Sequence, residues 1–293
     1  MSFAPTDAAF EGFRIVREKP GLVLAWAGFY FVALLAMIAV LLIGLGPKLM
    51  TLAPVVDAGS GRDLDQLKER FGIPILLVIP MAMVMMTMLT AAVYRAVLRP
   101  DDTGFFYLRF GADELRLLAL NIIIVGLAAL LSAVYGAAVI WLSRAVGDAL
   151  GGALTVLGTF GGALLAVWVA VRMSLAAPIA FAERRIRLLG AWQETRGRFW
   201  PLLTMWLLTV LAVFVLILLA AVTGAGLTWA LGGFTLLREV THEAPSAISR
   251  GDAIGLLLQL VLQMAIQVLG VVLLSVIAYA SPARGYQRIA RHP

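Results

Sequence analysis

Residues 117–142 read "LLALNIIIVGLAALLSAVYGAAVIWL" and contain no aspartate, glutamate, lysine or arginine. A helix needs roughly 20 mostly apolar residues to cross the hydrocarbon of a bilayer, so this stretch predicts a transmembrane helix. Five other stretches of the chain share its character. The sequence therefore predicts six spans, over residues 21–46, 73–98, 117–142, 153–180, 201–223 and 253–280.

The predicted fold class is all-α, a polytopic transmembrane helix bundle. Apolar residues make up 62% of the 293 residues, charged residues only 14%, and the mean hydropathy is +0.97. An ordinary soluble domain of this size would not have such a composition. We expect a single integral membrane domain over residues 1–293, in which six spans pair as three hairpins and short amphipathic helices lie at the interface.

The composition also excludes several kinds of site. There is no cysteine, and the only histidines are His242 and His292, which excludes disulfides, thiolate metal sites and a histidine-rich metal centre. Every one of the 17 carboxylates lies outside the longest apolar stretches. We therefore expect no metal, no other cofactor, no catalytic group of residues and no nucleic-acid partner.

The basic residues predict the orientation in the membrane. Sixteen of the 23 lysines and arginines lie in the two terminal segments and the loops at 95–116 and 172–198, against seven in the other three loops. The positive-inside rule then predicts a multi-pass protein of the bacterial cytoplasmic (inner) membrane with both termini in the cytoplasm. The first apolar stretch is longer than that of a signal peptide, so we expect it to be retained.

Three connecting segments on the predicted cytoplasmic side look amphipathic: "TDAAFEGFRIVREKPG" from residue 6, "RPDDTGFFYLRFGADELRLL" from residue 99, and "ERRIRLLGAWQETRGRFW" from residue 183. In the last of these, Ile186, Leu189 and Trp192 follow at intervals of three, as on one helix face. Each segment precedes an odd-numbered span, which suggests a degenerate threefold repeat of hairpins.

Glycines suggest two further features of the helices. On the outer side, "SGRDLDQLKERFG" predicts a short helix that begins at Ser60 and ends at Gly72. The apolar run from Phe199 to Leu231 would make a helix of about 50 Å, longer than a bilayer needs. We therefore expect a break near Gly224 and Gly226.

The stretch "RMSLAAPIAFAERRIRLLGAWQETRGRFWPLLTMWLL" resembles the membrane domain attached to some bacterial glycerophosphodiester phosphodiesterases, and its stand-alone relatives. The specific elements are the run from Arg172 to Pro178 and the pattern of Trp192, Thr195, Gly197 and Phe199. The function of that membrane domain is largely unknown. The fused enzymes need a soluble barrel, whereas no soluble stretch here exceeds roughly 30 residues, so we do not expect hydrolase activity.

Three glutamines share a stripe within the sixth span. Gln259, Gln263 and Gln267 stand at i, i+4 and i+8, and this spacing puts them on one side of a helix. They either hydrogen-bond to neighbouring helices, at about 0.6 to 2 kcal/mol each, or line a polar cavity for a lipid headgroup or a small solute. Asn121 is one of the few polar partners that the spans offer.

Arginines at the ends of spans are the other candidate site residues. Arg172 lies within or at the end of the fourth span, ahead of Pro178, and an ionisable group there is a functional hypothesis. We expect it to extend to lipid phosphates, as Arg95 would, or to bind Tyr94, Glu183 or a bound phosphate. Anionic headgroups at the cytoplasmic face would contact the arginines of the next loop: Arg184, Arg185, Arg187, Arg196 and Arg198.

Gly158 and Gly162 stand four residues apart and would allow close helix packing within or between chains. From all these features we expect a non-enzymatic membrane protein that binds or organises lipid or partner proteins, with a homo-oligomer as one form of partner. The alternative is a small transporter or channel whose polar cavity is lined by the glutamine stripe. An intramembrane enzyme would need a nucleophile and a base, or a metal.

Overall fold

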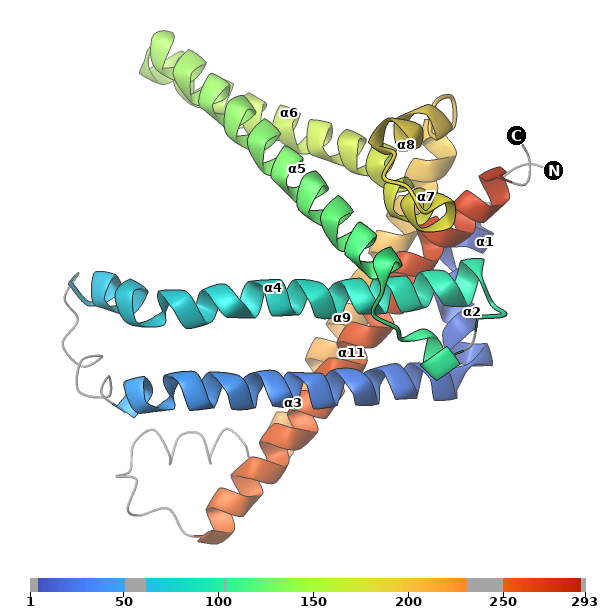
Figure 1. Ribbon diagram of the computed structural model, residues 1–293. Helices are drawn as coiled ribbons and strands as arrows, with labels where there is room; N and C mark the ends of the chain where they lie inside the picture. Colours follow the sequence, from blue (N-terminus) through green and yellow to red (C-terminus); the bar gives the residue numbers. More distant parts are fainter. Residues whose placement is uncertain (1–4, 51–61, 103, 231–249, 291–293) are drawn as a thin grey trace. The chain divides into compact units, whose positions relative to one another are not determined.

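The computed structural model describes residues 5–50, 62–102, 104–230 and 250–290 (Figure 1). These residues form helices and connecting turns, with no strand among them. The elements are α1 (Pro5–Ala9), α2 (Glu11–Glu18), α3 (Pro20–Met50), α4 (Arg62–Leu98), the 3-10 turn η2 (Gly104–Tyr107), α5 (Ala112–Ala145), α6 (Asp148–Met173), α7 (Ala176–Glu183), α8 (Leu188–Glu194), α9 (Phe199–Ala230) and α11 (Arg250–Ala290).

Within the described residues, six helical stretches are long and apolar enough to cross a membrane. Helices α3, α4, α5, α9 and α11 provide five of them, and α6 together with α7 provides the remaining one. In hydrocarbon a chain must pair its own backbone polar groups, which a helix does within one segment. The prediction of an all-α, multi-pass membrane protein is confirmed.

The chain divides into two compact units. Unit 1 comprises residues 1–14, 90–211 and 277–293, and unit 2 comprises residues 15–89 and 212–276. Unit 1 holds Arg172 and the arginines that follow it, whereas unit 2 holds the glutamine stripe. The two candidate sites therefore belong to different units.

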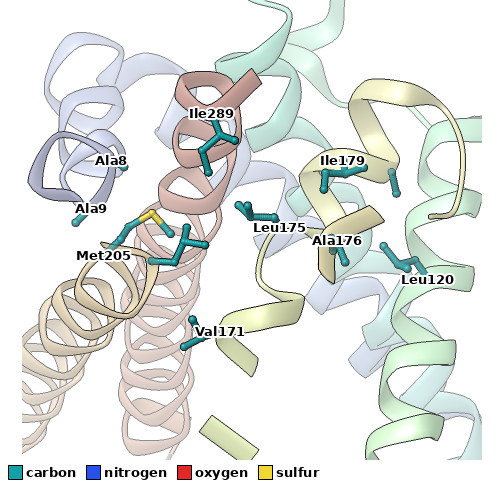
Figure 2. Packing of buried hydrophobic residues seen from close by; sticks show 12 residues of the cluster. Ala8, Ala9, Leu120, Val171, Leu175, Ala176, Ile179, Met205 and Ile289 are labelled. Carbon is teal, nitrogen blue, oxygen red and sulfur yellow. The ribbon is translucent and has the colours of Figure 1, made fainter. Parts of the chain in front are cut away.

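Unit 1 has a buried apolar cluster that joins its helices (Figure 2). The cluster takes residues from the two ends of the chain and from the segment where α6 passes into α7: Ala8 and Ala9 from α1, Leu120 from α5, Val171 from α6, Leu175, Ala176, Ile179 and Ala180 in and before α7, Ala191 from α8, Leu202 and Met205 from α9, and Ile289 from α11. Burial of apolar surface stabilises a fold by about 25 cal/mol per Å². The burial of these side chains therefore holds in place the segment that carries Arg172.

The fourth span is not one straight helix, because α6 ends at Met173 and α7 begins at Ala176. Pro178 explains the interruption. Its nitrogen has no hydrogen to donate, and its ring would clash with the carbonyl four residues earlier, which is that of Ser174. The backbone N–H of Ser174 donates to Val171 O at 3.4 Å where α6 ends. The span predicted over residues 153–180 is present, with an interruption between α6 and α7.

Two expected helix ends were wrong. Helix α9 continues through Gly224 and Gly226 to Ala230, and α4 continues from Arg62 through Gly72 to Leu98. A glycine within a helix costs about 1 kcal/mol relative to alanine, whereas each unpaired backbone group in an apolar environment costs more. Ser60, the expected start of the outer helix, lies outside the described residues.

The first and third amphipathic segments contain short helices, with different boundaries from those predicted, whereas Phe105 and Phe106 in the second have left-handed backbone angles. The N-terminal segment forms α1 and α2, which are separated at Phe10, and Pro20 begins α3. In the third segment Ile186 precedes α8 and only Leu189 and Trp192 are helical. The expected face of three apolar residues is therefore incomplete, because Arg184 adopts a left-handed conformation (φ 56°) that ends α7.

Candidate functional site

Arginines stand near the C-terminal ends of α4, α6 and α11, and all of them belong to unit 1. They are Arg95 and Arg99, Arg172, and Arg284 and Arg288. Helical side chains tilt toward the N-terminus of their helix, so an arginine in the last turn of a span points back toward the membrane. Its charge then needs a partner unless the side chain bends toward the water.

The charge of Arg95 is neutralised within the protein. Its side chain is only 4% exposed, and Nη2 donates to Glu114 Oε1 at the start of α5. Nη1 donates to the backbone oxygen of Tyr107 at 2.9 Å. The other carboxylate oxygen of Glu114, which is 1% exposed, accepts from the backbone N–H of Gly111 at 2.9 Å. The expected extension of Arg95 to lipid phosphates is therefore wrong.

Arg99 lies one turn beyond Arg95 and is held in the same way. Its Nη1 donates to Asp113 Oδ2 at 3.2 Å and its Nη2 donates to the backbone oxygen of Phe181 at 3.0 Å. The guanidinium also lies 4.8 Å from the centre of the Phe181 ring, within cation–π range. Residues 95–116 contain four arginines and four carboxylates, so this connection between α4 and α5 is balanced in charge.

The end of α11 is paired with the N-terminal helices of the same unit. Arg288 Nη2 donates to Asp7 Oδ2 at 3.0 Å, and Arg284 Nε lies 3.6 Å from Glu11 Oε2, an ion-pair distance beyond hydrogen-bond length. The hydroxyl of Ser281 donates to the backbone oxygen of Ala9 at 3.1 Å. At the ends of α4 and α11 alike, arginines four residues apart meet two carboxylates.

Arg172 is held by different chemistry. Its guanidinium carbon lies 5.6 Å from the centre of the Trp168 ring on α6 and 5.3 Å from that of Trp192 on α8. The two indoles contact each other edge to face, with their centres 4.9 Å apart. Nη1 donates to the Thr195 hydroxyl oxygen at 3.4 Å, which is a long hydrogen bond. Nε is buried and has no hydrogen-bond partner among the described residues.

The two expected protein partners of Arg172, Tyr94 and Glu183, make other contacts. Tyr94 lies against Phe181 and Tyr279, and Glu183 Oε2 accepts from Arg187 Nη1 at 3.0 Å. The guanidinium of Arg172 lies beside Trp168, one turn earlier on α6, and its expected contact with lipid phosphates stays a prediction. The structure brings Arg172 together with Trp192 and Thr195, two of the residues of the sequence pattern.

The loop after Arg172 is strongly basic. Residues 172–198 contain six arginines and two carboxylates. Arg184, Arg185, Arg187 and Arg196 are exposed and Arg198 is half-buried. Among the described residues, only Arg187 of these five has an ion-pair partner. We call these five residues the arginine face; Trp200, whose side chain is 74% exposed, follows it directly.

Gly158 and Gly162 lie where α6 crosses α5, the adjoining helix of the hairpin in Figure 1. A Cβ atom on Gly158 would come within 2.6 Å of Val139 Cγ1, and one on Gly162 within 2.8 Å of Tyr135 Cε1. The Tyr135 hydroxyl donates to the backbone oxygen of Gly158 at 2.8 Å. These contacts lie within one hairpin of one chain.

The glutamine stripe of unit 2 is not uniform. Gln259 and Gln263 are half-buried and Gln267 is exposed. Gln263 lies against α9, where a Cβ atom on Gly224 would be 3.1 Å from its Nε2, and the buried Oε1 of Gln259 has no hydrogen-bond partner among the described residues. Each step of four residues turns about 40° past a full helical turn, which separates the first amide from the last. Asn121 belongs to unit 1 and is half-buried on α5.

Sequence reasoning missed three residues of these sites. Glu114, Trp168 and the acceptor role of Thr195 were not identified from the sequence. One signal was present in the sequence: arginines four residues apart near the ends of α4 and α11, each with two acidic residues in a neighbouring segment. Within the described residues, no three histidine, aspartate or glutamate side chains gather as metal ligands would.

No protein-family model matches the chain, and no similar protein was found among curated sequences or solved structures. The resemblance to the membrane domain of the phosphodiesterases stays a prediction.

Proposed function

We propose that the protein is a non-enzymatic protein of the bacterial cytoplasmic membrane that binds anionic lipid headgroups through the arginine face. Four of the five arginines have no ion-pair partner among the described residues, and this observation carries the proposal. Exposed arginines beside a membrane gain about 1 kcal/mol each from anionic lipids.

The surroundings of the arginine face support the proposal. Trp200 and Ile186, which is 40% exposed, provide apolar surface beside the charges, as interfacial segments commonly do. Arginine donates two parallel hydrogen bonds to a phosphate, which suits it to lipid headgroups. The positive-inside count supports a cytoplasmic position for this face and for both termini.

Lipid titration of the purified protein in a neutral detergent tests the proposal. Phosphatidylglycerol and phosphatidylcholine are added in turn, and bound lipids are counted by native mass spectrometry. A variant with all five arginines of the face changed to glutamine should bind the more weakly held phosphatidylglycerol molecules at least about tenfold more weakly, a loss of about 1.4 kcal/mol, with little change for phosphatidylcholine.

A matched control removes five basic residues that the positive-inside rule assigns to the other side of the membrane: Arg62, Lys68, Arg70, Arg144 and Arg250, each to glutamine. This control should retain phosphatidylglycerol as the wild type does. If both variants lose phosphatidylglycerol equally, the binding depends only on net charge. If neither variant loses it, the proposal is rejected.

Unit 2 offers a second candidate function, transport of a small solute or lipid. The observation that favours it is the buried Oε1 of Gln259, which has no hydrogen-bond partner in the part of the chain that the structure describes, beside the close approach of Gln263 to Gly224. Because the chain has no cysteine, single Cys substitutions at Gln259, Gln263 and Gln267 can be labelled without background. Modification of the first two by a small hydrophilic reagent in intact membranes would support a water-accessible path, and protection would support packing.

A further inference from the structure

We infer that Arg172, oriented by Trp168, Trp192 and Thr195, binds the phosphate of one membrane lipid. This inference rests on the proposed function, because it names one specific site beside the arginine face. It differs from general attraction to a charged surface in requiring one arginine, one phosphate and a fixed geometry.

Most of the hydrogen-bond donors of Arg172 have no acceptor among the described residues. A guanidinium has five N–H groups, all in its own plane. The indoles of Trp168 and Trp192 interact with its charge, but a cation–π contact leaves in-plane donors free for other acceptors. Among the described residues the only hydrogen bond from Arg172 is the 3.4 Å contact with Thr195. An oxyanion is the acceptor that such a set of donors prefers.

Among the described residues, the arginines at the ends of α4 and α11 have carboxylate partners, unlike Arg172. Glu114 and Asp113 neutralise the end of α4, and Glu11 and Asp7 neutralise the end of α11. Within the part of the chain that the structure describes, Arg172 has no carboxylate partner at all. A charge near the end of a span is stabilised by an anion, and an anion from outside the protein would supply the one that Arg172 lacks among the described residues.

The position of the site indicates a lipid as the source of that charge. Arg172 stands in the last turn of α6, and its guanidinium lies over Trp168, one turn further into the span. Trp168 is 37% exposed, on a helix whose side chains face mostly outward from unit 1. Tryptophans and arginines at this level of a membrane protein lie beside lipid phosphates.

Native mass spectrometry of the full-length protein in neutral detergent tests the inference, with phosphatidylglycerol as the probe. Diacylglycerol with the same acyl chains lacks the phosphate and is the negative control. We expect the wild type to retain one phosphatidylglycerol more tightly than the rest. Arg172→Gln should weaken this first lipid at least about tenfold, whereas the five-arginine variant should lose weakly bound lipids and retain the first.

The outcomes separate the two proposals. If Arg172→Gln binds the first lipid as the wild type does, the inference is overturned while the proposed function stands. If the five-arginine variant retains all its lipid but Arg172→Gln loses the first one, the arginine face is not the binding surface and the phosphate site stands alone. Competition by millimolar inorganic phosphate or glycerol 3-phosphate would overturn the lipid as the source and leave a site for free phosphate.

A second variant covers the case in which Arg172→Gln does not fold. Thr195→Asp retains Arg172 and places a carboxylate where the hydroxyl now lies, so the arginine becomes paired like Arg95. This variant should lose the tightly bound lipid. Thr195→Asn changes the shape without the charge, and its loss should be several-fold smaller. Retention of the lipid by Thr195→Asp would also overturn the inference.

Discussion

The connections at residues 95–116 and 172–198 each follow an arginine at the end of a span, yet they treat that arginine in opposite ways. The first contains as many carboxylates as arginines, and Glu114 takes the charge of Arg95 out of reach of any ligand. The second has six arginines for two carboxylates, and Arg172 is held by two indoles and a hydroxyl. The same residue type at similar positions is structural in one connection and available for binding in the other.

The end of α11 repeats the arrangement at the end of α4, because in both places two arginines four residues apart meet two carboxylates. Arg172, the arginine of α6, also stands in the last turn of its helix but has no acidic partner in the described part of the chain. Arg172 therefore differs from the arginines of α4 and α11 by what surrounds it and not by its place in the sequence.

The largest loss of stability is expected when Arg95, like Arg172, is left without a carboxylate partner. Glu114→Gln retains an oxygen that can accept from the Gly111 N–H, but it removes the negative charge beside a buried guanidinium. Breaking a buried ion pair in this way costs about 3–5 kcal/mol. Unfolding in mixed detergent–SDS micelles should therefore require markedly less SDS.

The double variant Arg95→Met with Glu114→Gln is the control, because it removes both charges and should recover most of the lost stability. If the single variant unfolds as the wild type does, the pair between α4 and α5 is not structural and the comparison fails.

The next effect concerns the response to lipid. At a phosphatidylglycerol concentration about 100 times its Kd, binding should stabilise the wild type by about 2.7 kcal/mol. Arg172→Gln should show much less of this gain in thermal unfolding, while its stability without lipid stays close to that of the wild type. If phosphatidylglycerol stabilises both proteins equally, Arg172 does not contribute to lipid binding, which is the result expected for Arg95.

The next prediction concerns the packing of the α5–α6 hairpin, which begins at the end of the 95–116 connection and ends at the start of the 172–198 connection. Gly158→Ala would place a methyl group within 2.6 Å of Val139 Cγ1, and such overpacking typically costs about 1–3 kcal/mol. Gly126→Ala on α5, where an added Cβ would meet no other side chain or helix of the described residues within 4 Å, is the control and should be neutral or slightly stabilising. Thermal unfolding that fails to distinguish the two variants would contradict the packing described for the hairpin.

The smallest effect should come from the exposed pair of Arg187 and Glu183. The two side chains are 50% and 29% exposed and stand four residues apart, and such pairs contribute about 0.3–0.5 kcal/mol. Arg187→Gln should leave the unfolding midpoint almost unchanged while lowering the number of weakly bound phosphatidylglycerol molecules. A large loss of stability would show that the arginine face is structural, as the 95–116 connection is.

The spans could be predicted from sequence because apolar length is a local property. The continuity of helices could not be predicted as well: Gly72, Gly224 and Gly226 are helix-ending signals in water, but hydrocarbon penalises unpaired backbone groups more than it penalises glycine. Pro178 shows the reverse, since its missing donor and its ring interrupt a helix that hydropathy alone would extend.

The partners of the arginines required the three-dimensional structure. Glu114 is 19 residues from Arg95, and Thr195 is 23 residues from Arg172. Nothing in the sequence alone distinguishes a carboxylate that begins a helix from one that also neutralises a buried charge. Arg172 was recognised as a candidate because of its position at a span end, but the two indoles beside it were not.

The contacts of Ser281 with Ala9 and of Arg288 with Asp7 join residues that lie 272 and 281 positions apart in the chain. A ribosome makes these partners at the beginning and at the end of translation, tens of seconds apart at bacterial speeds of about 5–20 residues per second. The first helices of unit 1 must therefore wait, already synthesised, until α11 arrives. Unit 1 reaches its final form only after nearly the whole protein has been inserted.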